Sequence, residues 1–151
     1  MYSVRQWSVR HARGLNAFYS GFEALLVRLN GVFGWLGYER IDEPVAVIEK
    51  AVKGLLFDCR MCGQCVLSST GMSCPMNCPK NLRNGPCGGV RDDGNCEVKP
   101  DMKCVWVEAY RGSTRIPGGI EAMTKVQFAV DQRLQGRSSW LRVVREKSGA
   151  P

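Results

Sequence analysis

The sequence has little of what most enzyme active sites use. It contains a single histidine, His11, among 151 residues, which disfavours a histidine general base and any mixed cysteine–histidine zinc site. No glycine-rich loop with a lysine precedes a helical pattern, and no carboxylates are paired for acid–base chemistry. We therefore identify no catalytic residue in this chain.

Long apolar runs are also absent. The most apolar stretch, residues 22–38, is interrupted by Glu23, Arg28 and Asn30, so it is not expected to span a membrane. The first residues, "MYSVRQWSVRHARG", lack the apolar core of a secretory signal. We expect a cytoplasmic chain without a transmembrane segment, in a compartment where thiols stay reduced.

Dense basic runs and basic–aromatic repeats are missing too, although the formal net charge is +7. Only the net charge supports the hypothesis of a zinc ribbon that binds nucleic acid, and we expect no nucleic-acid partner. Hydrophobic residues make up 44% and charged residues 23% of the chain, which is typical of a globular protein rather than a disordered one. A basic balance of this size fits an acidic protein partner.

What the sequence does have is cysteine, in the spacing C-x2-C-x2-C-x8-C-x3-C-x8-C-x8-C-x7-C. The eight residues are Cys59, Cys62, Cys65, Cys74, Cys78, Cys87, Cys96 and Cys104. Disulfides are disfavoured because no secretion signal is seen, and a thioredoxin-like pair is disfavoured because no β-α-β pattern surrounds it. Covalent haem attachment fails because neither C-x2-C is followed by histidine. The spacing therefore indicates a metal site.

The opening C-x2-C-x2-C favours iron–sulfur over zinc. Three ligands at this step suit three corners of a cubane, as in bacterial ferredoxins, whereas a zinc knuckle usually takes its ligands in pairs. Proline follows Cys74 and Cys78 and restricts the backbone there. Two glycines follow Cys87, and because they have no side chain, a bulky cluster can approach their backbone closely. We predict that all eight cysteines are metal and cofactor ligands of two [4Fe-4S] clusters. One or two zinc ions, or one cluster and one zinc, stay open as alternatives.

The sharing of ligands between two centres does not follow from the spacing. We expect Cys59, Cys62 and Cys65 to share one centre, which a cysteine further along the chain completes. In two-cluster ferredoxins the last ligand of a run belongs to the other cluster, so we expect the two ligand sets to interleave.

Around the cysteines the pattern predicts a mainly α protein with a central irregular cysteine-rich metal-binding module that contains a short β-hairpin. We divide the chain into a helical segment at residues 1–57, the module at 58–110 and a second helical segment at 111–151. Asp93-Gly94 is a strong tight-turn signal and places the hairpin between Val90 and Val98.

Apolar residues at three- and four-residue steps predict three helices, within residues 15–36, 44–57 and 118–136. Pro44 suits the first turn of the second helix. The apolar residues that share a face of this helix are Val45, Ile48, Val52 and Leu55. Such faces either form the core or bind a partner, and the sequence leaves both open.

The stretches "CRMCGQC", "TGMSCPMNCPKNLRNGPCGG" and "CEVKPDMKCVW" resemble the cysteine-rich C-terminal module of certain methylenetetrahydrofolate reductases. In some bacteria this module is a separate small subunit beside a flavin-bearing catalytic barrel. The resemblance covers roughly residues 44–115. It implies that the eight cysteines bind metal, which is iron–sulfur in the two-subunit enzymes, and it implies no catalytic residue here.

The resemblance thus implies an accessory subunit of an oxidoreductase rather than an enzyme acting alone, because 151 residues do not hold a barrel of about 250. We expect an electron-transfer subunit that partners the flavin-bearing methylenetetrahydrofolate reductase catalytic subunit in one-carbon metabolism. Its electron donor would be an acidic protein such as ferredoxin. The alternative is a zinc-binding structural or interaction subunit with no redox role.

Overall fold

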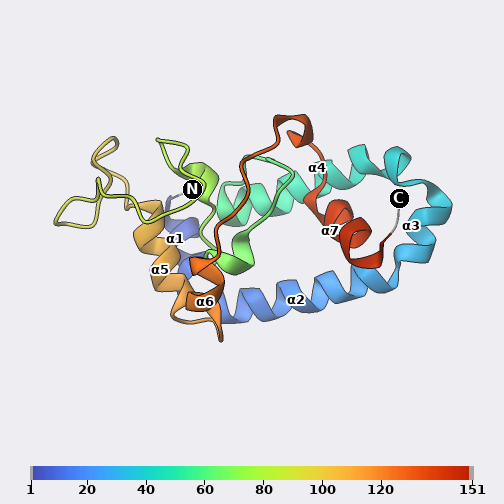
Figure 1. Ribbon diagram of the computed structural model, residues 1–151, viewed down its shortest axis with the longest axis horizontal. Helices are drawn as coiled ribbons and strands as arrows, with labels where there is room; N and C mark the ends of the chain where they lie inside the picture. Colours follow the sequence, from blue (N-terminus) through green and yellow to red (C-terminus); the bar gives the residue numbers. More distant parts are fainter. Residues whose placement is uncertain (1, 150–151) are drawn as a thin grey trace.

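The computed structural model describes residues 2–149, and it is mainly helical (Figure 1). The α-helices are α1 (Tyr2–Arg10), α2 (Ala12–Arg28), α3 (Asn30–Leu36), α4 (Tyr38–Phe57), α5 (Val105–Ser113), α6 (Gly119–Thr124) and α7 (Ser139–Ser148). Three short 3-10 helices are η1 (Leu67–Ser69), η2 (Pro75–Asn77) and η3 (Gln132–Leu134). None of the helices in this part of the chain is long and apolar enough to cross a membrane.

Helix α7 lies between α2 and α4 and contacts both of them (Figure 1). At the other end of the molecule α1 packs against α4 and α5. The cysteine-rich segment leaves the end of α4, passes through η1 and η2, and reaches α5 by way of loops that extend from one end of the molecule (Figure 1). The cysteine-rich segment therefore connects α4 to α5.

The first predicted helix is divided in the structure. Helix α2 ends at Arg28 and α3 begins at Asn30, and the backbone N–H of Leu29 still donates to the carbonyls of Leu25 and Leu26. Glycines in α3 lower the helix propensity beyond this point, which accounts for the interruption. The apolar face of α2 and α3 is largely exposed: the side chains of Phe18 and Trp35 are 73% and 84% exposed.

Helix α4 buries a different face from the one that its apolar pattern suggests. It begins at Tyr38, so Pro44 lies inside it, and the exposed residues include Ile48 and Leu55. The buried positions are Ala46, Glu49, Lys53 and Phe57. Glu49 and Lys53, at an i, i+4 spacing, thus lie in the interior, where their opposite charges form an ion pair.

The central segment is irregular, as predicted, but the short β-hairpin is not confirmed. Antiparallel bridges join Val90 to Cys96 and Asn95 to Lys103 as isolated pairs, and no extended strand forms among residues 2–149. The turn itself is present, since Gly94 has a φ of 79° and its N–H donates to the carbonyl of Arg91. The bridges are too short to build a ladder because the chain turns again toward Met102, whose carbonyl accepts from the N–H of Cys96.

The third predicted helix is much shorter than its pattern suggests. Helix α6 ends at Thr124, and residues 125–131 have no regular secondary structure before η3 begins. The backbone of this stretch bonds to other parts of the chain: Asp131 N–H donates to the Gln64 side chain, and Gln127 exchanges two hydrogen bonds with the Asn84 side chain. We call residues 125–136 the cover segment, because it runs along the first cysteines.

Candidate metal centre

Four consecutive cysteines line one cavity. They are Cys59, Cys62, Cys65 and Cys74, and we call them the first cysteine group. The cavity is walled on one side by Glu49 and Lys53 of α4 and by Ser139 of α7. The group takes its fourth member from the next cysteine in the sequence, so its lining is consecutive and not interleaved.

Left-handed backbone positions aim these cysteines inward. Asp58 ends α4 with a φ of 53°, and its N–H donates to the Gly54 carbonyl, which turns the chain toward Cys59. Met61 and Gly63 also have positive φ values, 49° and 69°. The N–H of Met61 lies 3.4 Å from the Cys59 sulfur, an orientation that would favour a thiolate there.

Burial keeps the thiols of Cys59 and Cys74 neutral unless a positive group compensates them. Burial, together with the charges of the neighbouring cysteines, raises the pKa of Cys59 to about 11 and that of Cys74 to about 12. A metal ion or cluster displaces such protons, because only the thiolate is a ligand. The buried thiols of the first cysteine group therefore need a positive ion or cluster inside the cavity before they become thiolates.

A buried polar network adjoins the cavity. The Lys53 ammonium lies 2.7 Å from the Glu49 carboxylate and 2.8 Å from the Ser139 hydroxyl, and both charged side chains are almost completely buried. Ser138 and the backbone N–H of Trp140 donate to Glu49 as well. Burial on its own lowers the pKa of Lys53, but the adjacent Cys65, Tyr19 and Glu49 outweigh it, so its pKa is raised and the ammonium stays charged.

Arg83 is the second cation on the wall of this cavity. Its Nη2 donates to the Gln64 carbonyl at 2.8 Å, and its Nη1 lies 3.9 Å from the Cys62 sulfur. Its Nε is buried and has no hydrogen-bond partner. A buried N–H without an acceptor is costly, and a sulfur-rich anionic group in the cavity would provide one.

The other four cysteines form what we call the second cysteine group, which lies in the loops and at the start of α5: Cys78, Cys87, Cys96 and Cys104. Cys78 and Cys96 pack together with Met102, and Cys87 packs against the neighbouring cluster that contains Cys104. The Lys80 ammonium lies 3.8 Å from the Cys87 sulfur and also forms an ion pair with Glu97. The Gly89 N–H lies 3.4 Å from the same sulfur, as expected for bare backbone beside a cluster.

All eight cysteines are free thiols, and across residues 2–149 no three side chains of histidine, cysteine, aspartate or glutamate converge as closely as one metal ion requires. The donor chemistry of the first group nevertheless fits both candidate occupants, since four thiolates hold either an iron–sulfur cluster or a zinc ion. The cavity volume is about 20 Å³, room for one water-sized guest. Either occupant therefore requires the thiols to rearrange, because a four-iron cluster is larger than this cavity and a zinc ion needs the sulfurs to converge more closely.

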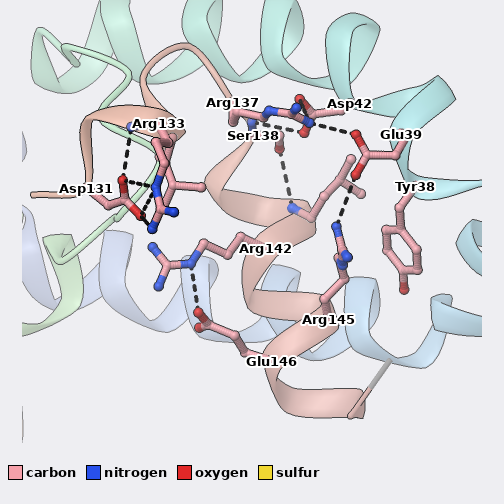
Figure 2. A pocket seen from close by; sticks show the side chains of 13 residues that line it. Tyr38, Glu39, Asp42, Asp131, Arg133, Arg137, Ser138, Arg142, Arg145 and Glu146 are labelled. Atoms are coloured by element: carbon pink, nitrogen blue, oxygen red, sulfur yellow. Dashed lines mark hydrogen bonds and ion pairs between the residues drawn. The ribbon is translucent and has the colours of Figure 1, made fainter. Parts of the chain in front are cut away.

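A larger hollow, of about 600 Å³, lies between α4, the cover segment and α7, and Figure 2 shows its charged lining. Each arginine in it faces a carboxylate. The ion pairs are Arg133 with Asp131, Arg137 with Glu39 and Asp42, Arg142 with Glu146, and Arg145 with Glu39. Because the charges are matched, the hollow offers no excess charge to a ligand, and we assign it no site.

The sequence pointed to the eight cysteines but not to the cations beside them. Glu49 and Lys53 have the i, i+4 spacing of a surface helix pair, and only their burial distinguishes them. Arg83 carries no sequence signal beyond its place among the cysteines. Its role becomes visible from its contacts with Cys62 and Gln64.

Comparison with known families gives one match. A family model described as methylene-tetrahydrofolate reductase C terminal matches residues 38–133, which is more than half of the chain. The match covers all eight cysteines, α4, α5 and most of the cover segment. No curated protein and no solved structure matches the chain.

Proposed function

Because the chain belongs to the family of methylene-tetrahydrofolate reductase C-terminal domains, we propose that it is an iron–sulfur electron-transfer subunit. Its partner would be a flavin-bearing catalytic subunit of the methylenetetrahydrofolate reductase type, in one-carbon metabolism. The observation that carries the proposal is the gathering of Cys59, Cys62, Cys65 and Cys74 around one cavity beside a buried lysine and an arginine with an unsatisfied N–H.

Iron–sulfur clusters supply one-electron transfer. The residues of this chain would hold two of them, one in each cysteine group, keep water away from the first group through α4 and α7, and orient N–H donors toward the sulfurs. Each electron passed on is taken from a donor protein, and two such transfers supply the electron pair that a flavin takes up. The net charge of +7 supports an acidic donor such as ferredoxin, because attraction over long range speeds encounter.

The exposed apolar side chains support a partner of some kind. On α2, α3 and α4 the exposed large hydrophobics include Phe18, Leu25, Val32, Trp35, Val47, Ile48 and Leu55. Apolar groups in such number on the helices of a small protein mark an interaction surface. The catalytic subunit is the partner that the family implies, and these helix faces are the surface we propose for it.

Anaerobic purification with metal analysis and a visible spectrum tests the proposal. We expect a brown protein with about eight iron and eight acid-labile sulfide per chain, which is what two four-iron clusters contain, and broad absorption that bleaches on reduction. Adding the reduced protein to the oxidised catalytic subunit should then bleach the flavin. A colourless protein that contains about two zinc ions and no iron would contradict the electron-transfer function.

A second candidate is a structural zinc subunit that shapes a complex and has no redox role. The observation that favours it is the small volume between the thiols of the first cysteine group, about 20 Å³, since a single tetrahedral ion needs only that the sulfurs close on it. The same metal analysis distinguishes the two. Zinc in both groups would leave the fold dependent on metal, so a chelator would unfold the protein without any change in colour.

A further inference from the structure

The exposed apolar side chains of α2 and α4 lie on different sides of the molecule. Both helices pack against α7, which lies between them: Glu49 of α4 bonds to the start of α7, and Phe22 of α2 contacts Trp140 (Figure 1). The exposed side of each helix is turned away from α7, so a partner that meets the metal centre has to be assigned to one of them. We call the exposed apolar residues of α4 the α4 stripe: Val47, Ile48, Val52 and Leu55.

A surface groove connects the α4 stripe to the first cysteine group. The groove has a volume of about 650 Å³, and it is lined by Val47 of the stripe and by Cys59 and Met61 of the cysteine loop. Cys59 and Met61 also line the interior cavity of the first group, so they form the wall between that cavity and the groove. In the part of the chain that the structure describes, neither space is lined by a residue of α2 or α3. Of the exposed apolar surfaces of the helices, the α4 stripe is therefore the one that adjoins the metal centre.

The first cysteine group approaches the surface at two of its members. Cys59 and Cys65 are partly exposed, whereas Cys62 and Cys74 are buried. Cys65 lines a smaller surface cavity, of about 120 Å³, together with the exposed Phe128 of the cover segment. Among the lining residues of that cavity Phe128 is the one large apolar side chain that is exposed, whereas the groove at Cys59 adjoins the four residues of the α4 stripe. An extended apolar contact therefore fits the Cys59 side better.

The charges of the groove distinguish between the two partners of the proposed function. Asp42 and Glu43 line it together with Lys50 and Arg60, so the positive and negative charges are equal in number. An acidic donor protein that is attracted over long range requires an excess of positive charge, which this groove does not have. An apolar stripe beside a neutral groove is instead typical of a lasting contact between subunits. The catalytic subunit is therefore the occupant that fits.

We propose that the flavin-bearing catalytic subunit docks on the α4 stripe and in the adjoining groove, and so meets the first cysteine group on its Cys59 side. This inference rests on the proposed function and narrows the surface given there to that of α4. The contact does not depend on how the sulfurs rearrange around a metal, because Cys59 directly follows Asp58, the residue that ends α4. Phe18 and Leu25 of α2 lie outside this interface.

Binding of the purified catalytic subunit to the full-length holoprotein, measured by isothermal titration calorimetry, tests the proposal. Val47→Glu and Leu55→Glu change side chains that are 68% and 69% exposed, so both variants should fold as the wild type does. Each places a carboxylate in the apolar contact and should raise the Kd at least about tenfold. The reduced variants should also bleach the flavin more slowly at low concentrations of the catalytic subunit and recover the wild-type rate at saturation, since docking alone is weakened.

Two matched variants carry the same change to other surfaces. Phe18→Glu on α2 and Phe128→Glu on the cover segment also replace exposed apolar side chains, and each should change the Kd by less than about twofold. If Phe18→Glu weakens binding as much as Val47→Glu does, the docking surface is not specific to α4 and the proposal is wrong. If Phe128→Glu has the larger effect, the catalytic subunit meets the first group on its Cys65 side, which also contradicts the proposal.

The outcomes separate this inference from the proposed function. If the wild type does not bind the catalytic subunit, both are wrong. If it binds and the two α4 variants bind equally tightly, only the docking surface is overturned. Light scattering of the chain alone examines a second copy as the occupant: a dimer that Val47→Glu dissociates would contradict the proposal. Zinc in place of iron would remove the electron-transfer function, whereas the Kd values would still decide where the catalytic subunit docks.

Discussion

The two cysteine groups bury their sulfurs to a similar degree but have different neighbours. In the first, Cys62 and Cys74 are buried, and in the second, Cys78, Cys96 and Cys104 are buried. The first group is enclosed by α4, α7 and the cover segment, and it adjoins a fully buried polar network. The second lies among loops that extend from the end of the molecule, where its lysine is partly exposed (Figure 1).

This difference shows that burial of the thiols does not by itself distinguish the two groups. What distinguishes them is the surrounding chain: two helices and a buried ion pair adjoin the first group, whereas loops carry most of the second. The expected effects below, from the largest to the smallest, each act on one group and leave the other as its reference.

Replacing one ligand in each group should have the largest effect. Cys62→Ser and Cys96→Ser should each remove about half of the iron, because each group is proposed to hold one cluster independently. We expect Cys62→Ser to lower the thermal midpoint more, since the first group joins α4 to α7 and metal binding contributes to folding. Iron analysis and thermal unfolding under anaerobic conditions measure this. Loss of all iron in either variant would mean that the groups are not independent.

Breaking the buried ion pair should have the next largest effect. Lys53→Met leaves the Glu49 carboxylate buried without its partner, which typically costs about 3–5 kcal/mol of stability. Lys50→Met, on the exposed side of the same helix, is the matched control and should change stability by less than about 0.5 kcal/mol. Denaturant unfolding of the three proteins measures the difference.

A double variant examines the cause. Glu49→Gln together with Lys53→Met removes both charges, so it should be more stable than Lys53→Met alone. If the double variant is the less stable of the two, the loss comes from packing rather than from an unpaired charge. Either way, the second cysteine group should keep its iron, because no part of this network reaches it.

The two faces of α4 show where reasoning from the sequence succeeds and where it fails. Periodicity correctly identified a helix and an apolar face, but it gave no information on what that face contacts. In the structure Ile48 and Leu55 are 58% and 69% exposed, whereas Glu49 and Lys53 are 1% exposed. A charged pair is buried because its members, with Ser138 and Ser139, satisfy one another, and this depends on α7, which is distant in sequence.

The helix predicted through the cover segment was wrong for a related reason. Its apolar spacing predicts a helix through Leu134, but the backbone from residue 125 bonds instead to the loops that carry the cysteines. Gly136 N–H donates to the Met61 carbonyl at 2.8 Å, and the Gln135 side chain donates to the Arg60 carbonyl. Tertiary hydrogen bonds outweigh a local preference worth only a few tenths of a kcal/mol per residue. The sequence predicts the cysteines as ligands because ligand spacing is local, whereas the cations beside them come from long-range packing.

A methyl group added to a glycine in each group should have a moderate effect in the first and almost none in the second. Gly63 has a φ of 69°, and a Cβ there would meet the backbone carbonyl of Leu134 in η3. Gly63→Ala should therefore displace the cysteine loop from the cover segment, destabilise the protein by about 1–3 kcal/mol and reduce the iron content of the first group. Gly88→Ala, beside Cys87, meets nothing within 4 Å and serves as the control. If the two variants lose equal stability, the first cysteine group is not more tightly packed than the second.

Asp131 should give the smallest effect, and one that does not vary with pH. Its carboxylate accepts from the N–H and the side chain of Arg133, which lowers its pKa from 3.8 to about 2 and anchors the start of η3 in the cover segment. Because the folded pKa lies below the unfolded one, the stabilisation is present in full above pH 3.8 and is lost only as the pH falls toward 2. Asp131→Asn should thus lower the thermal midpoint slightly, and by the same amount at pH 5 and at pH 8. Asp92→Asn, in the exposed turn between Cys87 and Cys96, is the control and should leave the thermal midpoint unchanged. If the effect of Asp131→Asn grows between pH 8 and pH 5, Asp131 does not hold the cover segment as a carboxylate.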